Sequence, residues 1–304
     1  MILSQLKLKC KHFFIFGHTF NEILNKKGEN MLCTSDLALE SYESAEKTRI
    51  DGIVVKEDGN ITTVDVLDEN GAKAISKPVG KYVTLEIESF VNNTDIFDGR
   101  LDEFSSVLSS MLPDNISSVL VAALGNVNIT ADALGPKTRN YVLSTRHILN
   151  DFKRIEGFEN LFSVSAVSTG VLGETGIETF EIISGIADKI KPSIVIAVDA
   201  LAASSKERLG TTIQFSSSGI SPGSGVGNHR NEISEKTLGI PVIGIGIPTV
   251  ISTSVLGESS NSDTFVTPRE IDKITEQGAK LIGMGINACF QKDISHRDLF
   301  ALVG

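Results

Sequence analysis

The segments Ser118–Leu124 (SVLVAAL), Ser193–Asp199 (SIVIAVD) and Pro241–Ile247 (PVIGIGI) are short and almost wholly apolar. Strands that are covered by helices on both faces have this composition, because neither face meets water. Ser163–Ser168 is predicted to form a further strand. Stretches with helical apolar spacing separate these segments, as in right-handed crossover connections. The sequence therefore predicts an α/β fold with a mostly parallel sheet flanked by helices.

Between these strands, local signals predict where the helices lie. Apolar residues recur at helical spacing between positions 180 and 190, and Pro192 ends this predicted helix. A second helix is predicted over residues 136–152, because proline suits the first turn of a helix. Thr267 and Glu270 flank a proline in the pattern of a capping box, which predicts that the last long helix begins there.

The chain before the predicted sheet core has a different sequence pattern. Residues 50–90 contain short β-rich runs separated by turn pairs such as Asp58-Gly59, which is typical of strands joined by hairpins. We expect a β-rich N-terminal decoration here, followed by a sheet core over residues 118–304. Because no repeat, low-complexity tract or linker intervenes, residues 37–304 are predicted to form a single α/β domain.

Composition limits the function classes. The 304 residues carry a formal net charge of −10, which repels phosphate backbones and argues against nucleic-acid binding. Cys10, Cys33 and Cys289 match neither a disulfide framework nor a paired metal motif, which indicates a reducing cytoplasm. The apolar run at residues 12–16 is too short for a membrane span and lacks a signal-peptide cleavage site. We expect a protein or small-molecule partner, no membrane association, and neither a metal nor another cofactor.

The first thirty residues are interpreted as a disordered or non-native extension. Residues 27–30 (KGEN) can be reverse-translated into a purine-rich stretch that resembles a ribosome-binding site, and Met31 follows directly. We therefore expect natural translation to start at Met31. Cys10, His12 and His18 could instead form a metal cluster, which is the less favoured interpretation.

Two aspartates are candidates for chemistry at the carboxyl edge of the predicted sheet. Asp199 ends an otherwise apolar strand, where a buried charge is costly unless it is paired or shifted in pKa. Asp132 lies in the loop between the first strand and the following helix. Each could instead be a helix N-cap. If the two meet, they could share one proton and act as base and acid toward a peptide bond.

A glycine-rich run over residues 218–230 is the second candidate feature. It lacks the lysine ending of a phosphate loop, and its glycines have the wrong spacing for a dinucleotide site. Glycines allow close approach of a peptide backbone, so we expect a substrate-binding or oxyanion loop. Its candidate residues are Gly223, Ser224, Gly225, Gly227 and Asn228.

Other catalytic signatures are weaker. The chain has no GxSxG elbow and no HExxH zinc motif. His147 could be a base or ligand, although a solvated helix histidine is the favoured interpretation. Asp132, Asp199 and a histidine could in principle hold a metal ion, so a metal site stays open as an alternative.

The motifs along the chain resemble those of the germination protease family of endospore-forming bacteria. The matching segments cover nearly everything from Met31 onward. They are Ser35–Glu40, Leu124–Asn126 with Thr130–Pro136, Thr145–His147, Thr175–Thr179, Ala197–Ala203, Ser218–Ile220 with Pro222–Asn228, Leu238–Val242, Gly246–Val250 and Val266–Asp272.

The resemblance implies an endopeptidase that degrades small acid-soluble spore proteins in the cytoplasm of the spore core during germination. It implies a zymogen, with residues 31–36 as propeptide and autoprocessing at the Asp36–Leu37 bond. It further implies a homotetramer, a phosphorylase/hydrolase-like fold similar to hydrogenase maturation proteases, and catalytic aspartates that correspond to Asp132 and Asp199.

Two alternatives to an aspartic protease stay open, as does the assembly. One is a metal-dependent protease like the related maturation proteases, and the other is a non-catalytic protein that binds a peptide or nucleotide through the glycine-rich loop. The chain also departs from longer family members, since residues 250–267 are abbreviated and the tail after Phe290 differs. Those differences bear on the tetramer contacts more than on the chemistry.

Overall fold

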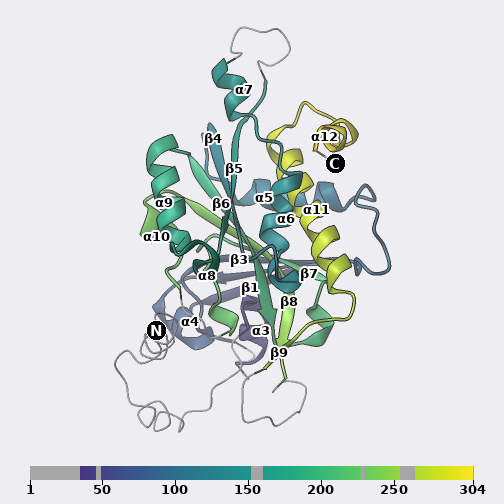
Figure 1. The fold of residues 1–304 in the computed structure, drawn as a ribbon. Coiled ribbons are helices and arrows are strands. Elements are labelled where there is room, and N and C mark those ends of the chain that lie inside the picture. The colour runs from purple at the N-terminus through teal and green to yellow at the C-terminus, as the bar shows by residue number, and fades with distance from the viewer. Residues whose placement is uncertain (1–34, 46–48, 152–159, 227–229, 254–263, 304) are drawn as a thin grey trace, which may run out of the picture. The chain divides into compact units, whose positions relative to one another are not determined.

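A computed structural model describes residues 35–45, 49–151, 160–226, 230–253 and 264–303 (Figure 1). The predictions for residues 1–30 and for most of the propeptide lie outside the described residues. Among these described ranges, nine strands form one sheet in the order β1-β2-β3-β7-β8-β6-β4-β5, with β9 paired to β8. The strands are β1 Ile53–Asp58, β2 Ile61–Val66, β3 Gly80–Glu86, β4 Ser118–Leu124, β5 Ser163–Gly170, β6 Ile194–Ala203, β7 Thr212–Ser216, β8 Val242–Ser252 and β9 Phe265–Val266.

The sheet is mixed, and its parallel part is the one expected from the apolar runs. Strands β8, β6, β4 and β5 are parallel neighbours. The β-rich segment adds β1, β2 and β3 as an antiparallel extension, which joins the parallel strands through β7. The predicted α/β class is confirmed, and the antiparallel half is larger than the words "mostly parallel" suggest.

Helices cover both faces of the parallel strands (Figure 1). The helices are α3 Ala38–Glu43, α4 Glu69–Ile75, α5 Arg100–Met111, α6 Leu134–Tyr141, α7 Arg146–Asp151, α8 Leu172–Thr175, α9 Thr179–Ile190, α10 Glu235–Leu238, α11 Ile271–Phe290 and α12 His296–Val303, with 3₁₀ turns η1 Thr130–Asp132, η2 Lys206–Arg208 and η3 Ser224–Val226. Val119 and Val121 of β4 share a core with α5, α6 and α11, whereas Leu120 and Ala122 pack with α9. Because successive strand residues face opposite sides, a strand between two helical layers must be apolar throughout.

The single helix predicted over residues 136–152 is wrong. Helix α6 ends at Tyr141 and α7 begins at Arg146. The backbone between them bonds to other elements instead: Leu143 N donates to Asn287 Oδ1, and Thr145 N donates to Val164 O. These tertiary hydrogen bonds replace the helical ones, so local propensity does not set the end of α6.

The capping box predicted at Thr267 is also wrong. Helix α11 begins at Ile271, and its N-cap residue Glu270 makes no side-chain capping bond. The hydroxyl of Thr267 donates to Pro268 O instead. The length and buried face of α11 therefore come from packing against the sheet rather than from a cap.

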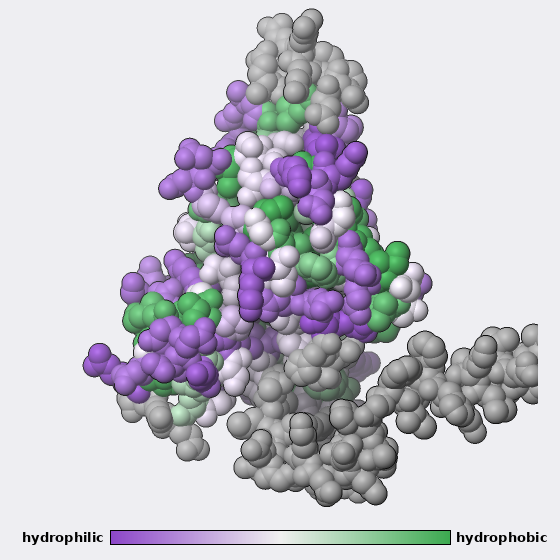
Figure 2. Space-filling view, turned by 90° about the vertical axis from the view of Figure 1, so that its left-hand side faces the viewer, coloured by the Kyte–Doolittle hydropathy of each residue, from purple (hydrophilic) through white to green (hydrophobic). Residues whose placement is uncertain are grey.

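The visible surface is mixed in polarity. On the side shown in Figure 2, hydrophobic groups are interspersed among hydrophilic ones. Within the part of the chain that the structure describes, none of the helices is long and apolar enough to cross a lipid bilayer.

Gly135 fixes how closely α6 approaches the end of β4 and the middle of β6. A Cβ atom at this position would lie 2.1 Å from Leu124 O and 2.6 Å from Val198 O. Both neighbours are strand backbone and cannot move without displacing the sheet. The first turn of α6 therefore rests directly on the sheet edge that carries both candidate aspartates.

Replacing Gly135 with alanine is expected to lower the melting temperature, because overpacking against backbone costs about 1–3 kcal/mol. Gly185→Ala in α9 is the matched control, since no atom lies within 4 Å of its Cβ position. Alanine is the better helix former by about 1 kcal/mol, so the control should melt at the same temperature or higher. Thermal unfolding of both variants checks this, and equal melting temperatures would contradict the close approach.

Candidate active site

Asp199 lies inside β6 rather than at its end. The predicted strand ended at Asp199, but β6 continues to Ala203 because β8 pairs with it along that whole stretch. The Asp199 residue is only 6% exposed, and its Oδ1 accepts a hydrogen bond from Ala200 N at 2.9 Å. Burial raises the pKa of Asp199 well above its ordinary value, and the nearby Asp132 carboxylate raises it further. A helix N-cap role for Asp199 is thereby excluded.

Asp132 ends the short turn η1, which follows β4. Its Oδ2 accepts a hydrogen bond from Asn126 N at 2.8 Å. Gly125 adopts a positive φ of 109°, and a Cβ there would lie 2.1 Å from Asp132 O, so the chain wraps tightly around the aspartate. The pKa of Asp132 is raised by burial and by Glu174, while the bond from Asn126 opposes the rise. The N-cap residue of α6 is Ala133, so Asp132 does not cap that helix either.

The parallel pairing of β4 and β6 brings the two aspartates to one edge. Ala123 of β4 is in register with Val198 of β6. Asp199, the residue after Val198, therefore lies at the level of the sheet where β4 ends and the loop that carries Asp132 begins. The electrostatic effect of Asp132 on the pKa of Asp199 reflects this proximity. Two carboxylates in such a position favour a state in which only one of them is ionised.

A third carboxylate, that of Asp36, also lies at this site and contributes to the raised pKa of Asp199. The Asp36 side chain accepts hydrogen bonds from Ala202 N at 2.8 Å and from the Ser224 hydroxyl at 2.7 Å. The Asp36 backbone N–H donates to Ala202 O at 2.9 Å. The N-terminal segment is thus docked along the end of β6.

The glycine-rich loop therefore contacts the segment that contains the predicted processing bond. Besides the bond from Ser224, a Cβ at Gly225 would lie 2.3 Å from an oxygen of Asp36, so only glycine permits this approach. Gly223 forms the turn before η3 with a φ of 73°. Gly227 and Asn228 lie outside the described residues.

Both sides of the Asp36–Leu37 bond are held by the protein. Gln214 Nε2 donates to Asp36 O at 2.9 Å, and Ala38 N donates to Gln214 Oε1 at 2.7 Å. Leu37 is completely buried in an apolar cluster that includes Leu201 and Ala203. The bond therefore lies between a half-buried Asp36 and a fully buried Leu37, and Gln214 holds the backbone on both of its sides.

Glu40 of α3 anchors the same segment from the other end. Its carboxylate accepts hydrogen bonds from Ser204 N at 2.6 Å and from Ser205 N at 3.0 Å, and it also bonds to the Ser35 hydroxyl. Arg208 Nε lies 3.7 Å from Glu40. These contacts satisfy a carboxylate that is almost fully buried.

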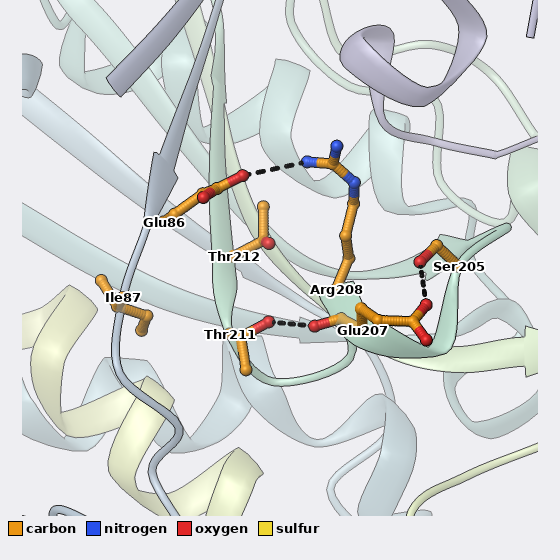
Figure 3. A pocket seen from close by; sticks show the side chains of 7 residues that line it. All are labelled: Glu86, Ile87, Ser205, Glu207, Arg208, Thr211 and Thr212. Carbon is orange, nitrogen blue, oxygen red and sulfur yellow. Dashed lines mark hydrogen bonds and ion pairs between the residues drawn. The ribbon is translucent and has the colours of Figure 1, made fainter. Parts of the chain in front are cut away.

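Arg208 ties α3 to the neighbouring strand. Its guanidinium also pairs with Glu43 at 2.8 Å and with Glu86 at 3.5 Å. Figure 3 shows Arg208 pointing toward Glu86 across a small pocket beside η2, whose walls include Ser205 and Thr212.

Lys77 holds the start of the docked segment. The half-buried Lys77 donates to Ser35 O at 2.6 Å, while burial lowers its pKa.

Sequence reasoning missed Gln214, Glu40 and Arg208. The one local signal for Gln214 is a polar side chain in a strand whose five residues are all buried. A buried polar group needs a partner, and that partner is 178 residues away in the chain. Two of the partners of Glu40, Ser204 and Ser205, are likewise separated from it by more than 160 residues.

The chain is similar to known peptidases. The family model "Germination protease" matches residues 31–264. A germination protease of Clostridium perfringens is 39% identical in an alignment that covers 87% of this chain and 97% of that protein. One of Bacillus cereus is 38% identical over 283 residues, which cover 87% of this chain and 76% of that protein.

Among solved structures, the chain is similar to the crystal structure of a [NiFe] hydrogenase maturation protease HycI from Thermococcus kodakarensis. The TM-score is 0.36 at 18% sequence identity, covering 60% of this chain and 99% of that chain. A similarity at this level does not establish a shared fold.

The burial of Asp199 has a measurable effect on stability. Because the pKa of Asp199 is raised in the folded state, its contribution to the free energy of unfolding is fully present below the ordinary pKa of 3.8. That contribution is lost as the pH rises through the folded-state pKa. Asp199→Asn removes the cost of protonating this carboxyl when the chain folds, so we expect a melting temperature a few degrees higher at neutral pH. The gain should shrink as the pH falls toward 3.8.

The matched control is Asp188→Asn, because Asp188 is 77% exposed and paired with Lys191 on the surface of α9. It should show little change at any pH. Thermal unfolding between acid and neutral pH measures both variants. A rise in the melting temperature of Asp199→Asn that does not depend on pH would contradict the explanation from the raised pKa of Asp199.

Proposed function

The chain belongs to the germination protease family, and from this premise we propose that its site hydrolyses peptide bonds with water activated by Asp132 and Asp199. The observation that carries the proposal is that the pairing of β4 with β6 places Asp199 and the turn of Asp132 at one level of the sheet, where the pKa of each carboxyl is raised, while Asp36 lies close enough to affect the pKa of Asp199. Perturbed pairs of this kind are typical of general acid and base catalysis.

The proposed roles follow from the surroundings of each carboxyl. Asp199 is the more deeply buried and has the more strongly raised pKa, so it holds the proton in the resting site. Asp132 takes a proton from water as the water oxygen attacks the carbonyl carbon. Asp199 gives its proton to the departing amide nitrogen, and the C–N bond breaks to leave a carboxyl group and an amine.

The substrates in this proposal are small acid-soluble spore proteins, cleaved in the spore core during germination. Family membership supports this assignment. The net charge of −10 is consistent with a protein substrate rather than nucleic acid. A homotetramer belongs to the same proposal and rests on the family resemblance.

The chain is proposed to be a zymogen that cuts its own Asp36–Leu37 bond. The docking of Asp36 beside Asp199 supports this step, since the segment lies where a substrate would be cleaved. Before processing, Asp36, bonded to Ala202 and Ser224, keeps other peptides out of the site. Cleavage makes Leu37 the new N-terminus and releases the propeptide that ends at Asp36.

Two other functions are alternatives that the same assays distinguish. A metal-dependent protease would lose activity on chelation and regain it when a divalent metal is restored. Among the described residues, no three His, Cys, Asp or Glu side chains are grouped to hold a metal ion. A non-catalytic binding protein would leave an added spore protein intact.

Asp132→Asn and Asp199→Asn are each expected to reduce cleavage by at least about 10²-fold, because each removes one partner of the proton transfer. The assay incubates the full-length chain with a purified small acid-soluble spore protein. It follows the loss of that substrate and the appearance of an N-terminus at Leu37.

Asp188→Asn serves as the control and should cleave at the wild-type rate, because Asp188 lies on the exposed surface of α9. Cleavage at the wild-type rate by either Asp132→Asn or Asp199→Asn would refute the aspartate mechanism. If the wild-type chain leaves the spore protein intact, the result would favour the binding function.

A further inference from the structure

Gln214 occupies the centre of β7 and is almost fully buried, at 6% exposure. Its partner on β8 is Gly246, and the partner of Gly246 on β6 is Asp199. Residues directly paired across strands project from the same face of a sheet. Gln214 and Asp199 therefore flank Gly246 on one face, at a separation of about 10 Å between their backbones.

Gly246 leaves room for the Leu201 side chain between these two residues. A Cβ at Gly246 would lie 2.5 Å from Asp199 O and 2.6 Å from Leu201 Cγ. Leu201 in turn packs against Leu37, the residue after the bond that is cut. The segment is thus bonded to Gln214 and packed on Leu201, and its Asp36 carboxylate is close enough to Asp199 to affect the pKa of that residue.

Both the N–H group and the oxygen of the Gln214 amide form hydrogen bonds to this segment. Its N–H group donates to Asp36 O at 2.9 Å, and its oxygen accepts from Ala38 N at 2.7 Å. The two bonds also define which amide atom is nitrogen, because one partner is an acceptor and the other is a donor. This is the pattern of hydrogen bonds by which a neighbouring strand would hold a peptide.

We propose that Gln214 positions the substrate backbone for cleavage and polarises the carbonyl that water attacks. The inference rests on the proposed function, in which the Asp36–Leu37 bond is hydrolysed. When water adds to the Asp36 carbonyl carbon, negative charge develops on its oxygen, and a donor already aimed at that oxygen stabilises it. The bond to Ala38 holds the departing side, so the bond to be cut cannot rotate away from the aspartates.

A second buried glutamine provides a control that distinguishes this role from purely structural hydrogen bonding. Gln291 is also buried, at 2% exposure, and it bonds both to Phe162 N and to Phe162 O at 3.0 Å. Its two bonds connect the end of α11 to the start of β5 in the fold, where no bond is cut. Gln291→Met is therefore a matched control for loss of a buried amide that bridges two backbone groups.

The experiment compares Gln214→Met, Gln214→Glu and Gln291→Met in the full-length chain. The readout is the first-order rate at which the Leu37 N-terminus appears, divided by the wild-type rate at the same pH. Gln214→Met removes the donor and should slow processing about 10²-fold, as expected for a lost donor to a developing oxyanion. Gln291→Met should lower the melting temperature and process at the wild-type rate when assayed well below it.

The pH dependence of Gln214→Glu distinguishes positioning from a general loss of stability. An ionised glutamate accepts from Ala38 N but cannot donate to Asp36 O, whereas a protonated one can donate through its O–H. Burial beside Asp36 and Asp199 favours the protonated form. The rate relative to wild type should therefore rise as the pH falls, and dividing by the wild-type rate removes the titration of the aspartates themselves.

Three outcomes would overturn the inference. They are processing of Gln214→Met within about twofold of wild type, a Gln214→Glu ratio that does not change with pH, and equal slowing by Gln291→Met. If Gln214→Met does not fold, the pH profile of Gln214→Glu carries the test. Asp199→Asn, measured in parallel, separates the two failures: if it blocks processing while the Gln214 variants do not, the proposed function stands and the role of Gln214 falls.

Discussion

The parallel pairing of β4 with β6 is the constraint on which the site depends. It aligns Ala123 with Val198 and so brings the turn that carries Asp132 beside the strand that carries Asp199. Two carboxylates that are buried together cannot both ionise without a large cost. Burial and then the neighbouring Asp132 raise the pKa of Asp199 well above its ordinary value. Gly135 supports the arrangement, because only glycine lets α6 approach the backbone of Leu124 and Val198 so closely.

The docked segment around Asp36 and Leu37 uses the same strand edge. Ala202 supplies both a donor and an acceptor to Asp36, while Ser224 and Gly225 close over its side chain. Glu40 continues the attachment through the backbone of Ser204 and Ser205. The contacts resemble those of a bound peptide more than those of a core element, since main-chain hydrogen bonds alternate with filled side-chain pockets. This supports the interpretation of the segment as the chain's own first substrate.

Sequence patterns predicted the parallel strands well, because strands covered on both faces must be apolar and short. The choice of Asp132 and Asp199 also came from the sequence, through their positions after such strands. Two of the errors have one common cause. The break after Tyr141 and the extension of β6 past Asp199 are set by bonds to distant elements, which local propensity does not contain, and α11 begins at Ile271 without a side-chain cap. Gln214 could not be assigned a role for the same reason, since both of its partners lie more than 170 residues away.

The central claim is that Asp132 and Asp199 form one coupled pair that holds a single proton at neutral pH. An NMR titration of the aspartate carboxyl carbons in the full-length chain tests it most directly. The account predicts that Asp199 stays protonated well above the ordinary aspartate pKa of 3.8 and that its titration changes when Asp132 is replaced by asparagine. Independent ionisation of both carboxyls near 3.8 would contradict it.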